Sequence, residues 1–138
     1  MALRTDKFFV NVAVKDLKQS MDFFGRVGFE FNLDFTDDNA ACMILNDHCY
    51  AMLLVESMFQ TFTKKEIADA SRSTEVILSL AAGSIEEVNE IVNRALAAGG
   101  KPANDPTDLG FMYVWSFQDL DNHMWEVFYM HPNGAQQQ

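Results

Sequence analysis

The chain carries the same succession of elements twice, and this internal repeat constrains its fold more than any other feature. In each half, a β-rich run leads into a helix pattern, and three short strand patterns follow the helix. Both helix patterns begin at a capping box, in which Asp16 precedes Gln19, and Ser84 precedes Glu87, by three residues. The repeat therefore predicts two tandem βαβββ modules.

Short turns separate the three strands that follow each helix. Such turns join antiparallel strands, whereas a doubly wound parallel sheet needs a long crossover between its strands. We therefore expect an α+β fold in which the two modules form an eight-stranded, mostly antiparallel open-barrel cleft, with a helix outside each sheet. The boundaries expected within a single domain of residues 1–138 are 7–56 for the first module, 57–73 for the linker and 74–130 for the second module.

The acidic composition limits the partners that the chain can have. Its formal net charge of −10 repels nucleic acid and anionic membranes, but it leaves a small-molecule ligand open. No apolar run approaches the length of about 18 residues that spans a bilayer. The first ten residues lack the apolar core of a signal peptide, so a cytoplasmic location is expected.

Two stretches carry a family resemblance. "FFVNVAVKDLKQSMDFFGRVGFEF", from Phe8, resembles the opening of the vicinal oxygen chelate superfamily, which includes glyoxalase I, extradiol dioxygenases, fosfomycin-modifying enzymes and bleomycin-binding proteins. "DLDNHMWEVF", from Asp119, resembles the closing motif of that family, with Asn122 in the usual glycine position. The resemblance covers about residues 7–130 and is closest to a bacterial subgroup described as predicted lactoylglutathione lyases. It implies the paired-module fold, and it implies a homodimer, because many relatives form one.

The resemblance also implies where a metal would bind. Metal-dependent relatives carry ligands on the first and last strands of each module. Phe9 stands where the first ligand is usually histidine, and residues 51–53 offer no donor at the matching position of the first module. Glu75 and Glu126 occupy the two positions of the second module. These two carboxylates are therefore candidate ligands for Ni, Zn, Co or Mn, but the set is incomplete for an octahedral ion.

The same strands predict the lining of a ligand cleft. Side chains alternate between the two faces of a strand, so Phe9 and Asn11 share one face, and Met124 and Glu126 share another. With Met52 and Trp115, the residues Phe9, Asn11 and Met124 are the candidate ligand-binding residues. Purely structural roles are also open for three of these residues. Phe9 could pack in the core, Asn11 could be a hydrogen-bonded core amide, and Glu126 could be a solvent-facing strand residue. Strand parity does not decide whether Trp115 and Trp125 face inward or outward.

Two functions fit these residues. The first is a glyoxalase-like enzyme of the lyase or isomerase type, which acts on a small molecule and uses Glu126 and Glu75 as catalytic carboxylates. The second is a ligand-sequestering protein of the bleomycin-binding kind, which needs an aromatic cleft and no metal. His48 and His123 stand in matching turns, "NDH" and "DLDNH", so we interpret both as turn residues.

Overall fold

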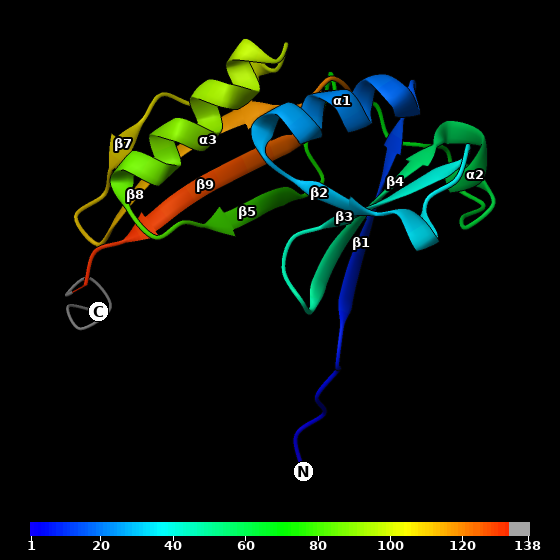
Figure 1. The fold of residues 1–138 in the computed structure, drawn as a ribbon, viewed down its shortest axis with the longest axis horizontal. Coiled ribbons are helices and arrows are strands. Elements are labelled where there is room, and N and C mark those ends of the chain that lie inside the picture. Colours follow the sequence, from blue (N-terminus) through cyan, green and yellow to red (C-terminus); the bar gives the residue numbers. More distant parts are fainter. Residues whose placement is uncertain (133–138) are drawn as a thin grey trace. The chain divides into compact units, whose positions relative to one another are not determined.

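The chain divides into two units, and the computed structural model describes residues 1–132 of it. The first unit comprises residues 1–25 and 29–68, and the second comprises residues 26–28 and those from 69 onward. Each unit contains one mixed β-sheet (Figure 1). Within residues 1–132, no helix is long and apolar enough to cross a membrane.

The first unit is built on a four-stranded sheet. Its elements are β1 (Phe8–Val14), α1 (Leu17–Val27), β2 (Glu30–Asn32), the 3-10 turn η1 (Leu33–Phe35), β3 (Ala40–Ile44), β4 (Cys49–Val55) and α2 (Glu56–Gln60). The strand order is β1-β4-β3-β2, in which β1 runs parallel to β4 and the other neighbours are antiparallel.

Helix α1 begins where the sequence predicts. Oδ1 of Asp16 accepts a hydrogen bond from the backbone N–H of Gln19 at 3.0 Å, so the N-cap is confirmed. The helix buries Leu17, Phe23 and Phe24. Buried strand residues on one face of this sheet are Val12, Val14, Ala41, Met43, Ala51 and Leu53. Their alternation along β3 and β4 leaves the intervening side chains on the opposite face of the sheet.

The second unit repeats this plan with additional short strands. Its elements are β5 (Ile77–Ala81), α3 (Ile85–Ala97), β6 (Lys101–Pro102), β7 (Thr107–Asp108), β8 (Met112–Gln118) and β9 (Met124–Met130). The strand order is β5-β9-β8-β6, and β7 also pairs with β8. Strand β5 runs parallel to β9, as β1 does to β4, and the other pairs are antiparallel.

Helix α3 covers one face of the second sheet. The predicted N-cap is present, because Ser84 Oγ accepts from Glu87 N–H at 3.1 Å. Glu87 Oε1 accepts from the N–H of Gly83 at 3.3 Å, one residue before the Ser84 N–H that a full capping box uses. The helix runs along β8 and β9 (Figure 1). The buried residues on the side of the sheet that faces the helix, and of the helix itself, are Val88, Val92, Ala95, Phe117, Trp125 and Val127. We call the other face of this sheet, which carries Glu126, the open face of the second sheet.

The α+β class and the tandem βαβββ-like modules are confirmed, but three details of the predicted fold are wrong. The described residues form nine strands rather than eight, in two mixed sheets of four and five. The additional strand arises because residues 101–108 pair with β8 in two short pieces, β6 and β7. A third helix, α2, follows β4 directly. The strand predicted from Glu75 begins instead at Ile77, because β9 starts at Met124, opposite Ile77, and earlier residues have no partner there.

The "DLDNH" turn is organised by one buried carboxylate. Asp119 is 2% exposed. Its Oδ1 accepts from the N–H groups of Asp121 and His123 at 2.9 and 3.0 Å, and its Oδ2 accepts from Trp125 Nε1 at 2.9 Å. Asn122 takes the left-handed conformation of the turn, with φ 69°. The turn interpretation of this motif is therefore confirmed.

The matching turn of the first unit uses an amide in place of the carboxylate. Asn46 Oδ1 accepts from the N–H groups of His48 and Cys49 at 2.7 and 2.8 Å. His48 therefore lies in a hairpin turn, as predicted.

Candidate functional site

The register of the first sheet gathers polar and aromatic side chains on one face. Phe9 lies beside Tyr50, and Asn11 beside Met52, in the parallel pair of β1 and β4. Met52 in turn pairs with Cys42 on β3. Neighbours in register point to the same side of a sheet, so these side chains share the face opposite the buried Ala51 and Leu53.

This face is hollowed at one end. A hollow of about 220 Å³, which we call the aromatic hollow, is lined by Lys7, Phe9, Asn32, Phe35, Cys42, Tyr50 and Met52. All of these residues belong to the first unit. Of the residues predicted to bind a ligand, Phe9 and Met52 line the hollow. Asn11 is exposed on the same face but does not line it.

The walls of the aromatic hollow are accessible aromatic rings. The Phe9 ring stacks on Tyr50, with centroids 4.9 Å apart and planes inclined by 18°. Phe9 remains 49% exposed and Phe35 67% exposed, so the reading of Phe9 as core packing is wrong. Lys7 Nζ lies 5.5 Å from the centroid of the Tyr50 ring, which is a cation–π distance. The hollow therefore presents an apolar stacking surface with one cation at its edge.

Cys42 forms part of the floor of the aromatic hollow. The thiol is 2% exposed. Burial raises its pKa above the ordinary 9.0, and the charge of Lys7 opposes that rise only partly. The thiol is therefore protonated near neutral pH, and it contributes a small apolar surface rather than a nucleophile.

Glu126 lies at the centre of the open face of the second sheet. Its neighbours in register are Ser79 on β5 and Ser116 on β8. Ser79 Oγ donates to Glu126 Oε1 at 3.1 Å, whereas Ser116 Oγ accepts from the N–H of Asn104 at 2.8 Å. The carboxylate is half-buried, and its side of the sheet is the one that α3 does not cover. It is thus held by a hydroxyl, on a surface that a ligand can reach.

The other predicted residues of the second module are not all near Glu126. Met124 shares its face, two residues earlier on β9. Glu75 is an exposed residue of a bend before β5. Trp115 pairs with Val127 and so lies on the face toward α3, where Trp125 is fully buried. The structure therefore shows which face of the sheet each tryptophan occupies, which the sequence left open. Neither Trp115 nor Trp125 shares the face of Glu126.

The side chains present do not fit the metal site of the relatives. Within residues 1–132, no group of three or more His, Cys, Asp or Glu side chains lies close enough together to hold an ion. Glu126 is flanked by the hydroxyls of Ser79 and Ser116, and Phe9 stacks on Tyr50 at the first-strand position. Two carboxylates alone are too few donors for an octahedral divalent ion.

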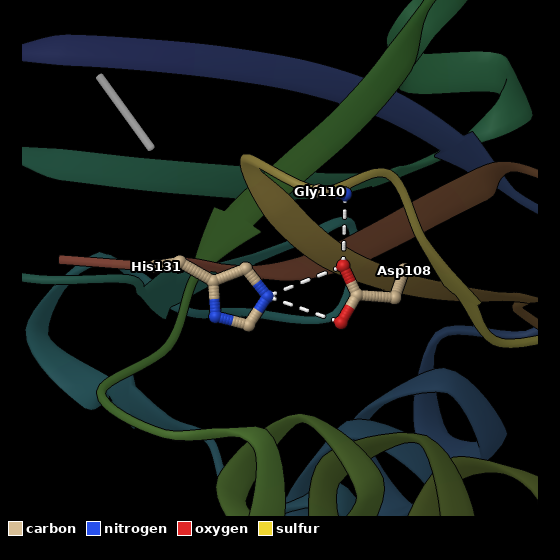
Figure 2. A network of polar contacts seen from close by, with 3 residues as sticks. All are labelled: Asp108, Gly110 and His131. Atoms are coloured by element: carbon tan, nitrogen blue, oxygen red, sulfur yellow. Dashed lines mark hydrogen bonds and ion pairs between the residues drawn. The ribbon is translucent and has the colours of Figure 1, made fainter. Parts of the chain in front are cut away.

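A histidine–carboxylate pair fastens the end of β9 and was missed by the sequence reasoning. His131 Nε2 lies 3.1 Å from Asp108 Oδ2 and 3.3 Å from Oδ1, and Gly110 N–H donates to Oδ1 at 2.9 Å (Figure 2). The Gly110 N–H, followed by His131, holds the pKa of Asp108 below its ordinary 3.8. The ionised carboxylate thus contributes stability above that pH, and the contribution is lost as the pH falls through the folded-state pKa.

Replacing His131 with glutamine is expected to raise the pKa of Asp108 only part of the way to 3.8, because the Gly110 N–H is the larger cause and remains. Carboxyl-carbon NMR titration of both proteins measures this change. His48→Gln, in the turn of the other unit, is the control and should leave the Asp108 titration unchanged. An Asp108 pKa that stays the same or falls in His131→Gln would contradict this assignment.

The two tandem modules, each with a helix and a mixed sheet, define a class of paired βαβββ proteins. The chain belongs to the Glyoxalase/Bleomycin resistance protein/Dioxygenase superfamily, whose family model matches residues 8–127. No curated protein matches the chain.

Solved structures resemble the chain over nearly its whole length. A hypothetical protein from S. aureus is 26% identical, with a TM-score of 0.77 and coverage of 94% of this chain and 95% of that one. A glyoxalase-related enzyme from Fulvimarina pelagi is 20% identical, with a TM-score of 0.76 and coverage of 92% and 88%. The fosfomycin resistance protein FosX from Listeria monocytogenes, complexed with Mn(II) and sulfate, is 17% identical, with a TM-score of 0.66 and coverage of 99% and 98%. The last two likenesses concern the fold alone.

Proposed function

We propose that this protein binds a small, planar, largely apolar molecule in the aromatic hollow, without a metal ion. The observation that carries the proposal is the stacked pair of Phe9 and Tyr50. Relatives that use a metal place a ligand at the position of Phe9. Here that position supplies a ring that is still 49% exposed and is free to stack on a partner.

The lining sets the chemistry of the expected ligand. Aromatic faces and the Met52 thioether favour an unsaturated or aromatic body. Lys7 and Asn32 are the polar groups of the lining, so a hydrogen-bond acceptor or anionic substituent belongs at that edge. A volume of about 220 Å³ lies below the range of about 300–1,000 Å³ for drug-sized ligands, which favours one or two rings.

The proposal is tested by a thermal-shift screen of aromatic metabolites and glycopeptide antibiotics in the presence of a metal chelator. A ligand that binds the folded chain raises its melting temperature by mass action. At least one planar aromatic compound should do so in wild type and lose the effect in Phe9→Ala. If no compound raises the melting temperature, the sequestering function loses its support.

A second candidate is favoured by the contact between Ser79 and Glu126. A carboxylate held on an accessible sheet face can move a proton between neighbouring carbons, which is the step that a glyoxalase-like lyase or isomerase requires. On this candidate, which includes the lactoylglutathione lyase type, Glu126 is the base and no metal is needed. Glu75 has no such contact, and we give it no step.

The second candidate is tested with the hemithioacetal of methylglyoxal and glutathione. Turnover without added metal would support this candidate if it disappears in Glu126→Gln. It should persist in Glu75→Gln, which makes the same change of side chain at the other glutamate and is the control. The absence of turnover, with or without Ni, Co, Zn or Mn, would remove it. The homodimer implied by the family resemblance stays a prediction.

A further inference from the structure

A second hollow, of about 350 Å³, lies wholly within the second unit and is lined mainly by polar side chains. We call it the polar hollow. Residues 70–74, which precede β5, form one wall, and Gln118, Asn122 and Met124 belong to the wall made by the ends of β8 and β9 and the turn between them. No aspartate or glutamate is among the described residues that line it, although the chain carries a net charge of −10. Its one charged lining residue is Arg72.

Asn122 lines this hollow from the turn between β8 and β9. It stands where the family motif usually has glycine and keeps the left-handed backbone of the turn, with φ 69°. Its Oδ1 accepts from Lys101 Nζ at 2.6 Å, which leaves the amide N–H₂ as the group that can donate to a ligand. The side chain therefore lines the hollow and also holds a second cation beside it.

The remaining lining groups are also suited to an anion. Gln118 Nε2 donates to the carbonyl of Pro102 at 3.0 Å, which leaves the second hydrogen of its amide group to donate to a ligand. Ser73 and Thr74 bring hydroxyl donors next to the Arg72 guanidinium. A guanidinium matches the two oxygens of a carboxylate or phosphate, and such charge-assisted hydrogen bonds are about twice as strong as neutral ones.

We propose that the polar hollow binds the oxyanion group of a small molecule, a carboxylate or a phosphate, with Arg72 as the cation and Asn122 as a donor. Met124 lines the hollow and shares its sheet face with Glu126, two residues further along β9. A ligand anchored by its oxyanion thus has the open face of the second sheet beside it. The proposal concerns the second unit only and is independent of the aromatic hollow.

The test is an NMR titration of the full chain with inorganic phosphate, acetate and methyl phosphate. Saturable shifts of the amides of residues 71–74 and 122 are expected. Arg72→Gln should weaken binding at least about tenfold. Arg4→Gln, the same change at an exposed residue outside the hollow, should leave binding unchanged. Tighter binding of the phosphates than of acetate would indicate a phosphorylated ligand, and the reverse order a carboxylate.

Asn122→Gly supplies a second variant that keeps the fold. Glycine accepts the positive φ of the turn without strain, so only the amide and its hold on Lys101 are removed. Binding of the preferred anion should weaken several-fold, with the spectrum of the free protein otherwise conserved. Absence of saturable binding by all three anions, or equal affinities in Arg72→Gln and Arg4→Gln, would overturn the proposal.

Discussion

Asp119→Ala is expected to lower the free energy of unfolding by about 3 kcal/mol. The substitution removes the acceptor of three donors, the N–H groups of Asp121 and His123 and the Nε1–H of Trp125. The Trp125 Nε1–H is buried, and a buried donor left without a partner costs about 1–3 kcal/mol, whereas the two N–H groups are half-buried and cost less. Relief of the desolvated carboxylate offsets part of this cost. Urea unfolding followed by tryptophan fluorescence measures the effect, with Asp47→Ala, an exposed aspartate in the matching turn of the first unit, as the control.

Asp119→Asn separates shape from charge at the same position. Burial raises the pKa of Asp119 above 3.8 in the folded protein. Between 3.8 and the folded-state pKa the folded chain holds the proton more tightly, so the contribution of Asp119 to stability falls as the pH rises through this window. Asparagine does not titrate, so Asp119→Asn should abolish this pH-dependent part of the free energy of unfolding. A loss below about 1 kcal/mol in Asp119→Ala would show that the turn does not depend on this carboxylate.

Phe9→Ala is expected to weaken binding of an aromatic ligand at least about tenfold, because the variant loses the stacking surface and its area. The fold should tolerate the change, since Phe9 is 49% exposed and lies on the edge strand β1. Isothermal titration with a ligand found by the screen measures the dissociation constant.

Phe62→Ala is the matched control for this prediction. Phe62 is 71% exposed and does not line the aromatic hollow, so the variant loses a ring of the same size elsewhere in the first unit. Its affinity should equal that of wild type. Equal weakening by both substitutions, or none by Phe9→Ala, would mean that the ligand binds outside the hollow.

The repeat and its caps predicted most of the fold because both are local signals. Capping residues at Asp16 and Ser84 fix where the helices begin, and both contacts are present. The first of the three strands expected after α3 is the short β6, whereas β7 escaped prediction because residues 101–108 contain two prolines and no apolar alternation. Both strands form only because β8 offers backbone partners, which is a property of the sheet rather than of the segment.

The candidate site was predicted in part, and strand parity explains which part. Alternation placed Phe9 and Asn11 on one face and Met124 and Glu126 on another, as the registers have it. The alternation of side chains within one strand does not show which residues of the neighbouring strand lie beside them. For this reason Tyr50 was missed, although it lies beside Phe9.

The polar contacts near the hollows depend on long-range packing. Lys7 precedes β1 and reaches Tyr50 from outside any periodic pattern. Trp115 was assigned to the ligand, but its register with Val127 puts it on the α3 face. Such placements follow from how the strands pair, which a single stretch of sequence does not encode.

The central claim is that the first unit binds an aromatic molecule through stacked rings and without a metal. The most direct measurement is an NMR titration, in the presence of a chelator, of the full chain with an aromatic ligand from the screen. The proposed function predicts saturable shifts centred on Phe9, Tyr50 and Met52, with the same dissociation constant when Zn(II) replaces the chelator. Binding that appears only with a divalent ion, or shifts centred on Glu126 instead, would contradict it.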